Sequence, residues 1–380
     1  MDGTSLHRAQ IDVLIPAYNA ETTIESAVAS IQSQTIRDVR IIVVNDGSTD
    51  RTREILNKIA ESDERIQVLT TVNGGIVSAL NAGLAVCNAE FIARHDADDL
   101  AYPDRFEAQL RFLQGEKDYV AVGSNIRHID QSGNLIGTQS RLYGDVRPDP
   151  DWLPSKEPYL MHPFLMVRLD AIRKAGGYRY VVHAEDTDLY WRLLDFGRLH
   201  NLRDIHGEYR IHSGSISSAS IVNGRVAAVA SQMAAISYKR RLQGLPDIDF
   251  SPGLRADYER AKTLSNILEI AGQSLSADER SYLKAASSAK LLSLMEYRPY
   301  VPDHQDCTFI GEALRQVTLS AQNKREISRL KGKTALRLLK LGKLSEAFAL
   351  QPSLENIARA AASNTKNILL KRKQSTALTN

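Results

Sequence analysis

Phe91-Ile92-Ala93-Arg94-His95-Asp96-Ala97-Asp98-Asp99 is the stretch that decides the fold. Its apolar start predicts a buried strand, and its acidic end predicts a loop at the point where that strand emerges. The three carboxylates within four residues repel one another unless a cation lies among them. Hard oxygen ligands at this density suit Mg²⁺ or Mn²⁺. The alternative interpretation is a solvated acidic turn that caps a helix.

Strand and helix patterns alternate on the N-terminal side of this stretch. Short apolar runs predict strands at residues 11–15, 39–44, 66–69 and 90–93, and helical spacing of apolar residues covers 20–34, 49–60 and 76–86. This alternation predicts an α/β fold with a parallel, doubly wound sheet. Polar clusters follow three of the strands, at residues 17–19, 45–48 and 96–98. Ligands gather at the carboxyl ends of such strands, so we expect one site built from separated segments.

The second part of the chain is helical in character. Residues 223–300 are rich in Ala, Leu, Ser and Glu at helical spacing, and residues 309–373 resume the pattern after a break near Pro302. We expect these last helices to end locally at Gly332, Gly342 and Pro352. The predicted boundary lies near residue 222, with an α/β domain over 1–222 and an α-helical region over 223–380.

Composition and charge restrict the class of protein. The chain has 380 residues, of which 24% are charged and two are cysteines (Cys87 and Cys307), and it shows no metal or disulfide spacing. The N-terminus is polar and no apolar run reaches 18 residues, so we expect a cytoplasmic protein in a reducing compartment.

The charge of the chain is unevenly distributed. Formal net charge is +3, yet residues 324–373 alone carry 13 Lys or Arg and three Glu. This basic segment predicts peripheral contact with an anionic lipid surface; a helix with merely solvated lysines is the alternative. Nucleic acid is not expected, because the segment holds one aromatic residue, Phe348.

Two polar turns precede predicted helices. Asp46-Gly47-Ser48-Thr49-Asp50 offers a carboxylate to a base or ribose and a glycine for close backbone approach, although helix capping explains it as well. Asn73-Gly74-Gly75 offers free backbone N–H groups to a phosphate. Neither turn completes a phosphate-loop or dinucleotide fingerprint, so neither an ATPase nor a dehydrogenase is supported.

A pair of carboxylates, Glu185-Asp186, starts a further helical pattern. The helix dipole stabilises ionised carboxylates there, and such a group can act as a general base toward a hydroxyl. Charge capping alone is the alternative, and Asp188 is a second candidate for the base by its chemistry. His212 lies in a polar, flexible stretch, where it either completes a metal site or is an ordinary loop histidine.

The ordered set of these motifs resembles the family-2 glycosyltransferases, bacterial inverting enzymes with a GT-A-type fold. The resemblance covers roughly residues 10–220 and rests on Pro16-Ala17-Tyr18-Asn19, residues 44–50, 73–75, 96–98, 185–186 and 212–215. It implies a GT-A-type, mostly parallel nucleotide-binding sheet flanked by helices. It also implies roles for individual residues. The expected nucleotide contacts are Pro16, Ala17, Tyr18, Asn19, Asp46, Asn73, Arg94 and Asp96; the metal ligands are Asp98, His212 and Asp96; the catalytic base is Asp186, with Glu185 beside it in donor or acceptor binding.

The resemblance implies an inverting transfer of a sugar from a nucleotide sugar, most often a UDP sugar, to a hydroxyl acceptor. Mn²⁺ or Mg²⁺ is the expected cofactor, and a saccharide or lipid-linked molecule of cell-surface polysaccharide synthesis is the expected acceptor. A processive polymerase is not expected, because the Gln-x-x-Arg-Trp motif is missing. Two alternatives remain open. A sugar-phosphate nucleotidyltransferase would carry a Gly-rich, basic signature after the first strand, where this chain has no basic residue before Arg37. A non-catalytic interaction protein would retain the fold without the chemistry.

Overall fold

The computed structural model describes residues 8–211 and 220–353, together with 355 and 357. His212, predicted as a metal ligand, therefore lies outside the described residues. By internal packing the chain divides into two compact units. The sheet unit comprises Met1–Arg147, Pro158–Tyr180 and Glu185–Ser213, and the helical unit comprises Pro148–Glu157, Val181–Ala184 and Gly214–Asn380.

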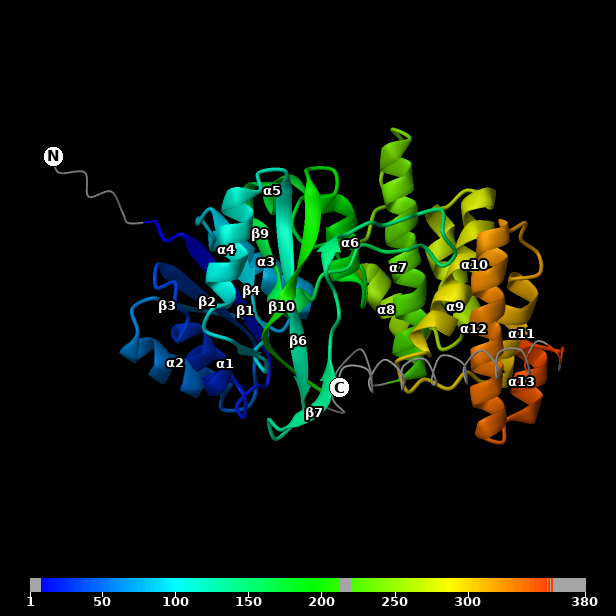
Figure 1. The fold of residues 1–380 in the computed structure, drawn as a ribbon, viewed down its shortest axis with the longest axis horizontal. Helices are drawn as coiled ribbons and strands as arrows, with labels where there is room; N and C mark the ends of the chain where they lie inside the picture. Colours follow the sequence, from blue (N-terminus) through cyan, green and yellow to red (C-terminus); the bar gives the residue numbers. More distant parts are fainter. Residues whose placement is uncertain (1–7, 212–219, 354, 356, 358–380) are drawn as a thin grey trace, which may run out of the picture. The chain divides into compact units, whose positions relative to one another are not determined.

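The sheet unit is built on strands in the order β3-β2-β1-β4-β9-β6-β10-β5 (Figure 1). The first four strands in the chain are parallel to one another, whereas β9 is antiparallel to both β4 and β6. The sheet is therefore mixed but mostly parallel at its N-terminal end, as predicted. Its strands are β1 (Ile11–Ala17), β2 (Val39–Asp46), β3 (Ile66–Thr71), β4 (Phe91–Arg94), β5 (Leu100–Ala101), β6 (Tyr119–Ile129), β7 (Leu135–Gln139), β8 (Gly144–Asp145), β9 (Met166–Arg168) and β10 (Arg198–Arg210).

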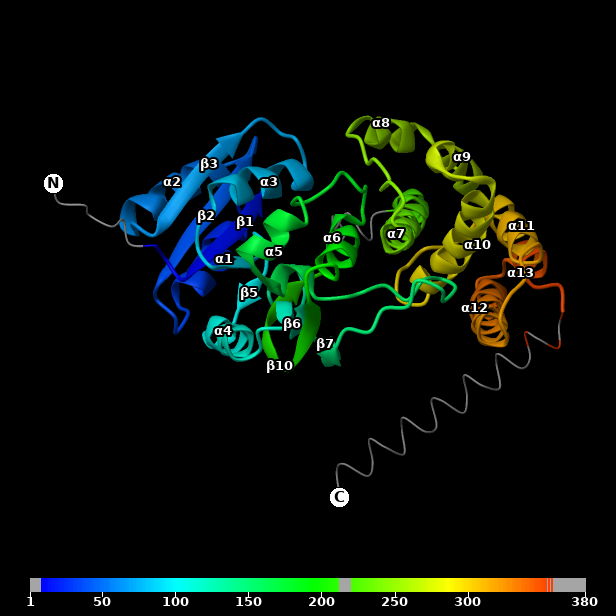
Figure 2. The same cartoon turned by 90° about the horizontal axis from the view of Figure 1, so that it is seen from above.

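Helices cover both faces of this sheet (Figure 1 and Figure 2). Ile11, Val13 and Ile15 point to one face and pack with α1, α2 and α4, while Leu14 and Val44 belong to the core of the other face with α3, α5 and α6. Strands buried on both faces read as continuous apolar runs, which is why β1 and β2 were recognisable in the sequence. The helices of the sheet unit are α1 (Ile24–Gln32), α2 (Thr52–Ser62), α3 (Ile76–Val86), α4 (Arg105–Gly115), η1 (His162–Phe164), α5 (Leu169–Lys174) and α6 (Glu185–Leu193).

The helical unit has one continuous core, which includes Leu153, Val181 and Ala184 from its two short segments that precede α6 in the chain. Gly342, with φ +75°, lies in the turn after α12, as the sequence predicted for a helix end. The prediction that a helix ends at Gly332 is wrong. Gly332 is buried within α12, where the packing of that face outweighs the roughly 1 kcal/mol that glycine costs in a helix. The elements of this unit are α7 (Ile221–Leu242), α8 (Gly253–Arg260), α9 (Leu264–Ala271), η2 (Gly272–Ser274), α10 (Ala277–Leu294), α11 (His304–Ala313), α12 (Ala321–Lys340) and α13 (Leu344–Leu350).

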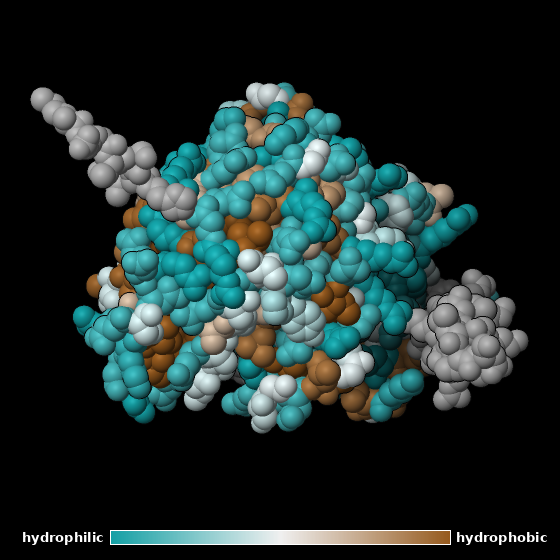
Figure 3. Space-filling model, turned by 60° about the vertical axis from the view of Figure 1, so that its left-hand side comes forward, coloured by the Kyte–Doolittle hydropathy of each residue, from teal (hydrophilic) through white to brown (hydrophobic). Residues whose placement is uncertain are grey.

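The exposed face drawn in Figure 3 is largely hydrophilic, with hydrophobic residues in small separate patches. In the described part of the chain, no helix has the length and apolar character needed to span a bilayer.

Candidate functional site

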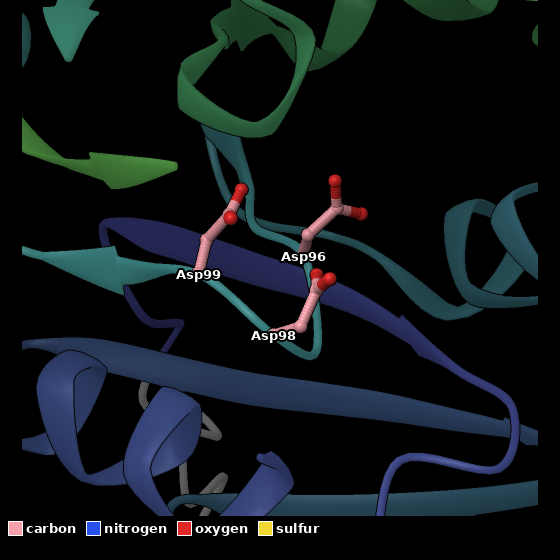
Figure 4. A group of neighbouring side chains, drawn as sticks. All are labelled: Asp96, Asp98 and Asp99. Carbon is pink, nitrogen blue, oxygen red and sulfur yellow. The ribbon is translucent and has the colours of Figure 1, made fainter. Parts of the chain in front are cut away.

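Three carboxylates gather in the turn between β4 and β5. The β4 chain stays in register with β1 up to its end, since the backbone N–H of His95 donates to the carbonyl of Leu14. The chain then turns, and Asp96, Asp98 and Asp99 rise on the same side of it (Figure 4). One ligand oxygen from each of the three lies within 4.8 Å of the others. The acidic turn predicted from the sequence is therefore a compact cluster of hard oxygen donors.

The electrostatics of Asp99 test whether this cluster fits a divalent cation. Its Oδ1 accepts a hydrogen bond from the backbone N–H of Arg210, but its Oδ2 is buried and has no hydrogen-bond partner among the described residues. Burial, followed by the charges of Asp96 and Asp98, raises the pKa of Asp99 well above its ordinary value. A buried oxygen without a partner, beside two like charges, is the arrangement that a divalent cation relieves. The residues present therefore fit Mg²⁺ or Mn²⁺.

The buried imidazole of His95 contacts the backbone of the acidic turn. Burial, followed by the charge of Arg105, lowers the pKa of His95 well below its ordinary value, so the ring is neutral. Arg105 can only donate, so Nδ1 of His95 accepts from it at 3.2 Å. Nε2 of His95 then carries the proton and donates to the carbonyl of Asp99 at 3.1 Å. His95 and Arg105 thus fix the backbone of the acidic turn.

Arg210, the last residue of β10, holds the turn from the other side. Its Nε donates to the carbonyl of Asp98 at 2.8 Å, and its Nη1 donates to the carbonyls of Asp130 and Gln131 at 3.0 Å each. One guanidinium therefore joins the acidic turn to the loop after β6. Nothing in the sequence distinguishes Arg210 except its position two residues before His212.

Arg94 lies between the acidic turn and α6. It is buried and forms an ion pair with Asp96, while its Nε and Nη1 have no hydrogen-bond partner among the described residues. Burial acts to lower the pKa of Arg94, but the charge and hydrogen bond of Asp96, together with Tyr178 and Asp99, outweigh it and the pKa is raised. A permanently charged guanidinium with two unsatisfied donors is suited to an anionic ligand.

Glu185 and Asp186 begin α6, as predicted. Burial, followed by the charge of Asp186, raises the pKa of Glu185 to about 7, and the charges of Arg94 and Asp96 also act on it. Oδ1 of Asp186 accepts from the backbone N–H of Thr187 at 2.6 Å. The first turn of α6 and the acidic turn after β4 thus share one electrostatic environment, although about 90 residues separate them in the chain.

Asp188, the alternative candidate for the base, is buried between two arginines. It is fully buried, and its carboxylate forms ion pairs with Arg179 and Arg192. Nε of Arg179 donates to it at 3.0 Å, and Nε of Arg192 does so at 2.9 Å. Both oxygens of this carboxylate are therefore engaged by guanidinium groups and are not open to an acceptor hydroxyl. Asp186 and Asp188 therefore differ in environment although they are neighbours in sequence.

His162 and Tyr178 form a buried pair in the same environment as Arg94 and Asp186. Nε2 of His162 lies 2.9 Å from the Tyr178 hydroxyl, and the charges of Arg94 and Asp186 act on that tyrosine. The side chain of Asn81 on α3 binds both the backbone N–H and the carbonyl of Tyr178. Nothing in the sequence connects the segments His162-Pro163 and Gly176-Gly177-Tyr178 to the carboxylates.

The residues expected to contact a nucleotide form a second group, at the carboxyl ends of β1, β2 and β3. Ala17 is buried in register with Asn45, and Tyr18 is 52% exposed at the end of β1. Asn19, with φ 48°, makes two hydrogen bonds to the turn after β2. Its backbone N–H donates to Oγ of Ser48, and its Oδ1 accepts from the backbone N–H of Thr49. The residues of this group are Pro16, Ala17, Tyr18, Asn19, Asp46 and Asn73.

Asp46 holds the Asn73-Gly74-Gly75 turn in place. Its Oδ1 accepts from the N–H of Gly74 at 3.0 Å and its Oδ2 accepts from the N–H of Gly75 at 2.8 Å. Gly47 follows with φ +68°, and a Cβ there would lie 2.7 Å from the backbone nitrogen of Asn73. The loops that follow β1, β2 and β3 are therefore connected by hydrogen bonds along one edge of the sheet. Whether Asp46 also contacts a nucleotide stays a prediction.

Among the described residues, the structure thus brings Arg94, Asp96, Asp98, Glu185 and Asp186 into one environment and joins residues 16–19, 46 and 73 in another. Sequence reasoning counted Asp99 among the three carboxylates but assigned it no role of its own, and it assigned none to Arg210 or Tyr178. The adjacency of Asp99 to two other carboxylates was a usable signal, whereas the partners of Arg210 and Tyr178 are distant in sequence and left none.

Comparison with known proteins identifies the class. The family model for glycosyl transferase family 2 matches residues 12–176. The O-antigen biosynthesis glycosyltransferase WbnJ of Escherichia coli is 30% identical over 215 residues, which cover 56% of this chain and 83% of that protein. Chondroitin synthase of Pasteurella multocida is 28% identical over 219 residues, which cover 57% of this chain but only 22% of the synthase. The chain belongs to glycosyltransferase family 2.

Two solved structures resemble the chain in fold. The S. aureus TarS 1-349 complex with UDP-GlcNAc has a TM-score of 0.50 at 16% identity and covers 90% of each chain. The mannosyltransferase PcManGT from Pyrobaculum calidifontis, in complex with GDP-Man and Mn²⁺, has a TM-score of 0.50 at 17% identity and covers 93% of this chain and 88% of its own. The GT-A-type fold predicted from the sequence is confirmed.

Proposed function

We propose that this chain transfers a sugar from a nucleotide sugar, in the first instance a UDP sugar, to a hydroxyl group of an acceptor in cell-surface polysaccharide or glycoconjugate synthesis. The observation that carries the proposal is the cluster of Asp96, Asp98 and Asp99, whose ligand oxygens lie within 4.8 Å of one another beside a buried Arg94 with two unsatisfied donors. Carboxylates for a cation and a guanidinium for an anion are the groups that a metal-bound diphosphate requires.

In this proposal Asp98 and Asp96, with His212, hold Mn²⁺ or Mg²⁺. The ion supplies Lewis-acid stabilisation of the charge on the leaving diphosphate when it is bound. Arg94 places a fixed positive charge beside the same diphosphate. Tyr18, exposed at the end of β1, offers its ring to the nucleotide base, together with Pro16, Ala17, Asn19, Asp46 and Asn73 as the surrounding edge.

Asp186 accepts the proton of the attacking acceptor hydroxyl, and Glu185 beside it binds donor or acceptor. Removal of that proton as the oxygen attacks raises its nucleophilicity, which is the usual task of a general base. Attack from the side opposite the leaving diphosphate, in a single displacement, inverts the anomeric centre. Asp188 has no part in this step, because Arg179 and Arg192 keep its carboxylate occupied.

The test is release of nucleoside diphosphate by the purified full chain from a panel of UDP and GDP sugars, with and without Mn²⁺. We expect metal-dependent release from at least one donor and its loss in Asp98→Ala. Asp118→Ala, which removes an exposed carboxylate of the same unit, is the matched control. A binding module that kept only the fold would release nothing from any donor. Release of pyrophosphate from a sugar phosphate and a nucleoside triphosphate would identify a nucleotidyltransferase instead.

The proposal also assigns a role to the turn between α12 and α13. Leu341, Leu344 and Phe348 are 52%, 60% and 39% exposed there, and Lys340 and Lys343 flank them. Exposed apolar side chains among lysines suit the interface of an anionic membrane. We therefore propose that the chain works in the cytoplasm, where its buried thiols stay reduced, and that residues 324–373 contact the inner face of the cell membrane, close to a lipid-linked acceptor.

Vesicle binding tests this contact. We expect the full chain to sediment with phosphatidylglycerol vesicles but not with phosphatidylcholine vesicles, and the double variant Leu344→Ser, Phe348→Ser to lose most of that binding. Leu242→Ser changes an equally exposed leucine of the same unit, 64% exposed, and should bind as the parent chain does. Undiminished binding of the double variant would remove this turn from the proposal.

A further inference from the structure

A cavity of about 490 Å³ opens on the helical unit beside the first half of α12. Its volume lies within the range of small-ligand sites. It is lined by Trp152, Ala321, Gln322, Arg325, Glu326 and Arg329, which we call the Trp152 groove. None of these residues belongs to the carboxylate cluster or the nucleotide-binding edge, and all of them lie within one unit. Arg325, Glu326 and Arg329 are part of the basic segment 324–373, at its end away from the turn of Leu341, Leu344 and Phe348.

Backbone bonds on both sides fix Trp152 in this groove. Asn323 of α12 accepts from the N–H of Leu153 at 3.1 Å and donates to the carbonyl of Asp151 at 3.3 Å. The hydroxyl of Tyr282 donates to the carbonyl of Pro150 at 2.7 Å. Since Leu153 is also buried in the core of the unit, the indole is presented by an ordered segment rather than by a loose loop. Little ordering free energy is then lost when a ligand packs on it.

The side of the groove that α12 contributes is mostly polar. Arg329 donates through Nε and Nη2 to Glu326, at 2.9 and 2.6 Å, and through Nη1 and Nη2 to Glu296, at 2.5 and 3.0 Å. The guanidinium is therefore held in one plane. Arg325 is exposed one turn before Arg329 and Gln322 about two turns before it, on the same face of α12. Lys333 also donates to Glu296, at 2.8 Å, so Arg329 and Lys333 are both paired with carboxylates and only Arg325 adds an exposed charge to this face.

We propose that the Trp152 groove binds a neutral saccharide chain, as the acceptor or the lengthening product of the transfer. This identification of the occupant rests on the proposed function. A pyranose ring has an apolar C–H face, which packs on the indole, and an edge of hydroxyl groups, which pair with the planar amide, guanidinium and carboxylate groups opposite. Arg329 is already paired with Glu326 and Glu296, which favours a neutral saccharide over a polyanion, whose phosphates or carboxylates would meet those two carboxylates.

Fluorine NMR of the full chain labelled with 5-fluorotryptophan tests the proposal. The chain has two tryptophans, and the other one, Trp191, is fully buried. We expect the Trp152 resonance, assigned with Trp152→Phe, to shift on addition of at least one of chitotetraose, cellotetraose, mannotetraose and maltotetraose at millimolar concentration. The Trp191 resonance should not move. Arg325→Ala should raise the dissociation constant about two- to tenfold, the loss expected for one exposed hydrogen bond, whereas Arg315→Ala on an exposed site of the same unit should not.

Several results would overturn the inference. These are an unmoved Trp152 resonance with all four oligosaccharides, equal binding by Arg325→Ala and the parent chain, or a shift with heparin alone. Nucleoside diphosphate release measured on the same samples separates this inference from the proposed function. Donor turnover without oligosaccharide binding contradicts the groove only, and binding at the groove without turnover of any donor contradicts the transferase only.

Discussion

The backbone N–H of Arg210 donates a hydrogen bond of 2.8 Å to Oδ1 of Asp99, across 111 positions of sequence. The side chain of Arg210 binds the carbonyl of Asp98 in addition. The last residue of β10 therefore holds both the backbone and one carboxylate of the acidic turn. Partners of this kind orient metal ligands without touching the metal, and their loss weakens metal binding.

Arg210→Lys is expected to raise the Mn²⁺ concentration that gives half-maximal nucleoside diphosphate release by about 10- to 100-fold, the usual effect of losing such a partner. Lysine cannot reach the carbonyls of Asp98, Asp130 and Gln131 together, whereas the backbone bond to Asp99 survives the substitution. Titration of activity with Mn²⁺ measures the change, and saturating Mn²⁺ should restore most of the rate. Arg53→Lys, on an exposed site of α2, is the control. An unchanged metal requirement would show that Arg210 does not position the turn.

Asp186→Asn is expected to lower the rate of transfer by about 100-fold or more, because asparagine cannot accept the proton of the acceptor hydroxyl. Donor binding should persist, since the substitution leaves the acidic turn and Arg94 intact. Thermal stabilisation of the variant by UDP and Mn²⁺ measures that binding, and single-turnover transfer measures the rate. Near-normal transfer by a folded Asp186→Asn chain would exclude this residue as the base.

Asp188→Asn is expected to act on stability instead. The substitution leaves the buried guanidinium of Arg192 and the half-buried one of Arg179 without their carboxylate partner, and breaking a buried pair such as Arg192–Asp188 typically costs about 3–5 kcal/mol. Urea unfolding should show the loss, and Asp118→Asn, which changes an exposed aspartate, should not. A stable Asp188→Asn chain without activity would instead make Asp188 the base.

Glu185→Gln should make the stability of the chain less dependent on pH. The folded-state pKa of Glu185 is raised from 4.5 to about 7, first by burial and then by Asp186, so the folded state holds a proton that the unfolded chain has released. The free energy of unfolding of the parent chain therefore falls as pH rises from about 4.5 to 7. Glutamine does not titrate, so the free energy of unfolding of the variant does not fall in this way. Between pH 4.5 and pH 8 the difference in that free energy between variant and parent should increase by up to about 3 kcal/mol, at 1.36 kcal/mol for each pKa unit. Parallel stability curves for the two chains over this range would contradict the assignment.

Much of the sheet unit was predictable because its strands are buried on both faces. Nearly continuous apolar runs such as Val13-Leu14-Ile15 and Ile41-Ile42-Val43-Val44 mark them, and Gly and Asp residues mark the turns between them. The antiparallel strand β9 was not predicted. It has only three residues, Met166–Arg168, and nothing in so short a run distinguishes a strand from a loop.

The site was predictable where its chemistry is local. Asp96 and Asp98 lie in one pentapeptide, and Glu185-Asp186 begins a recognisable helix. The environments were not predictable, because they depend on contacts between distant segments. Nothing near Asp188 in sequence shows that Arg179 and Arg192 both reach it, and nothing near Asp99 indicates Arg210. Burial and pairing distinguish the neighbouring aspartates 186 and 188, and both arise only on folding.

Leu153, Val181 and Ala184 belong to the core of the helical unit although they precede α6 in the chain. A single recombination event that replaced α7 to α13 by the corresponding helices of a relative would leave these three side chains in place. They would then pack against a core with which they did not evolve. Inheritance of the two parts is linked at several points of the gene. Sequence drift at these positions should follow the helical segment rather than the residues that immediately flank them.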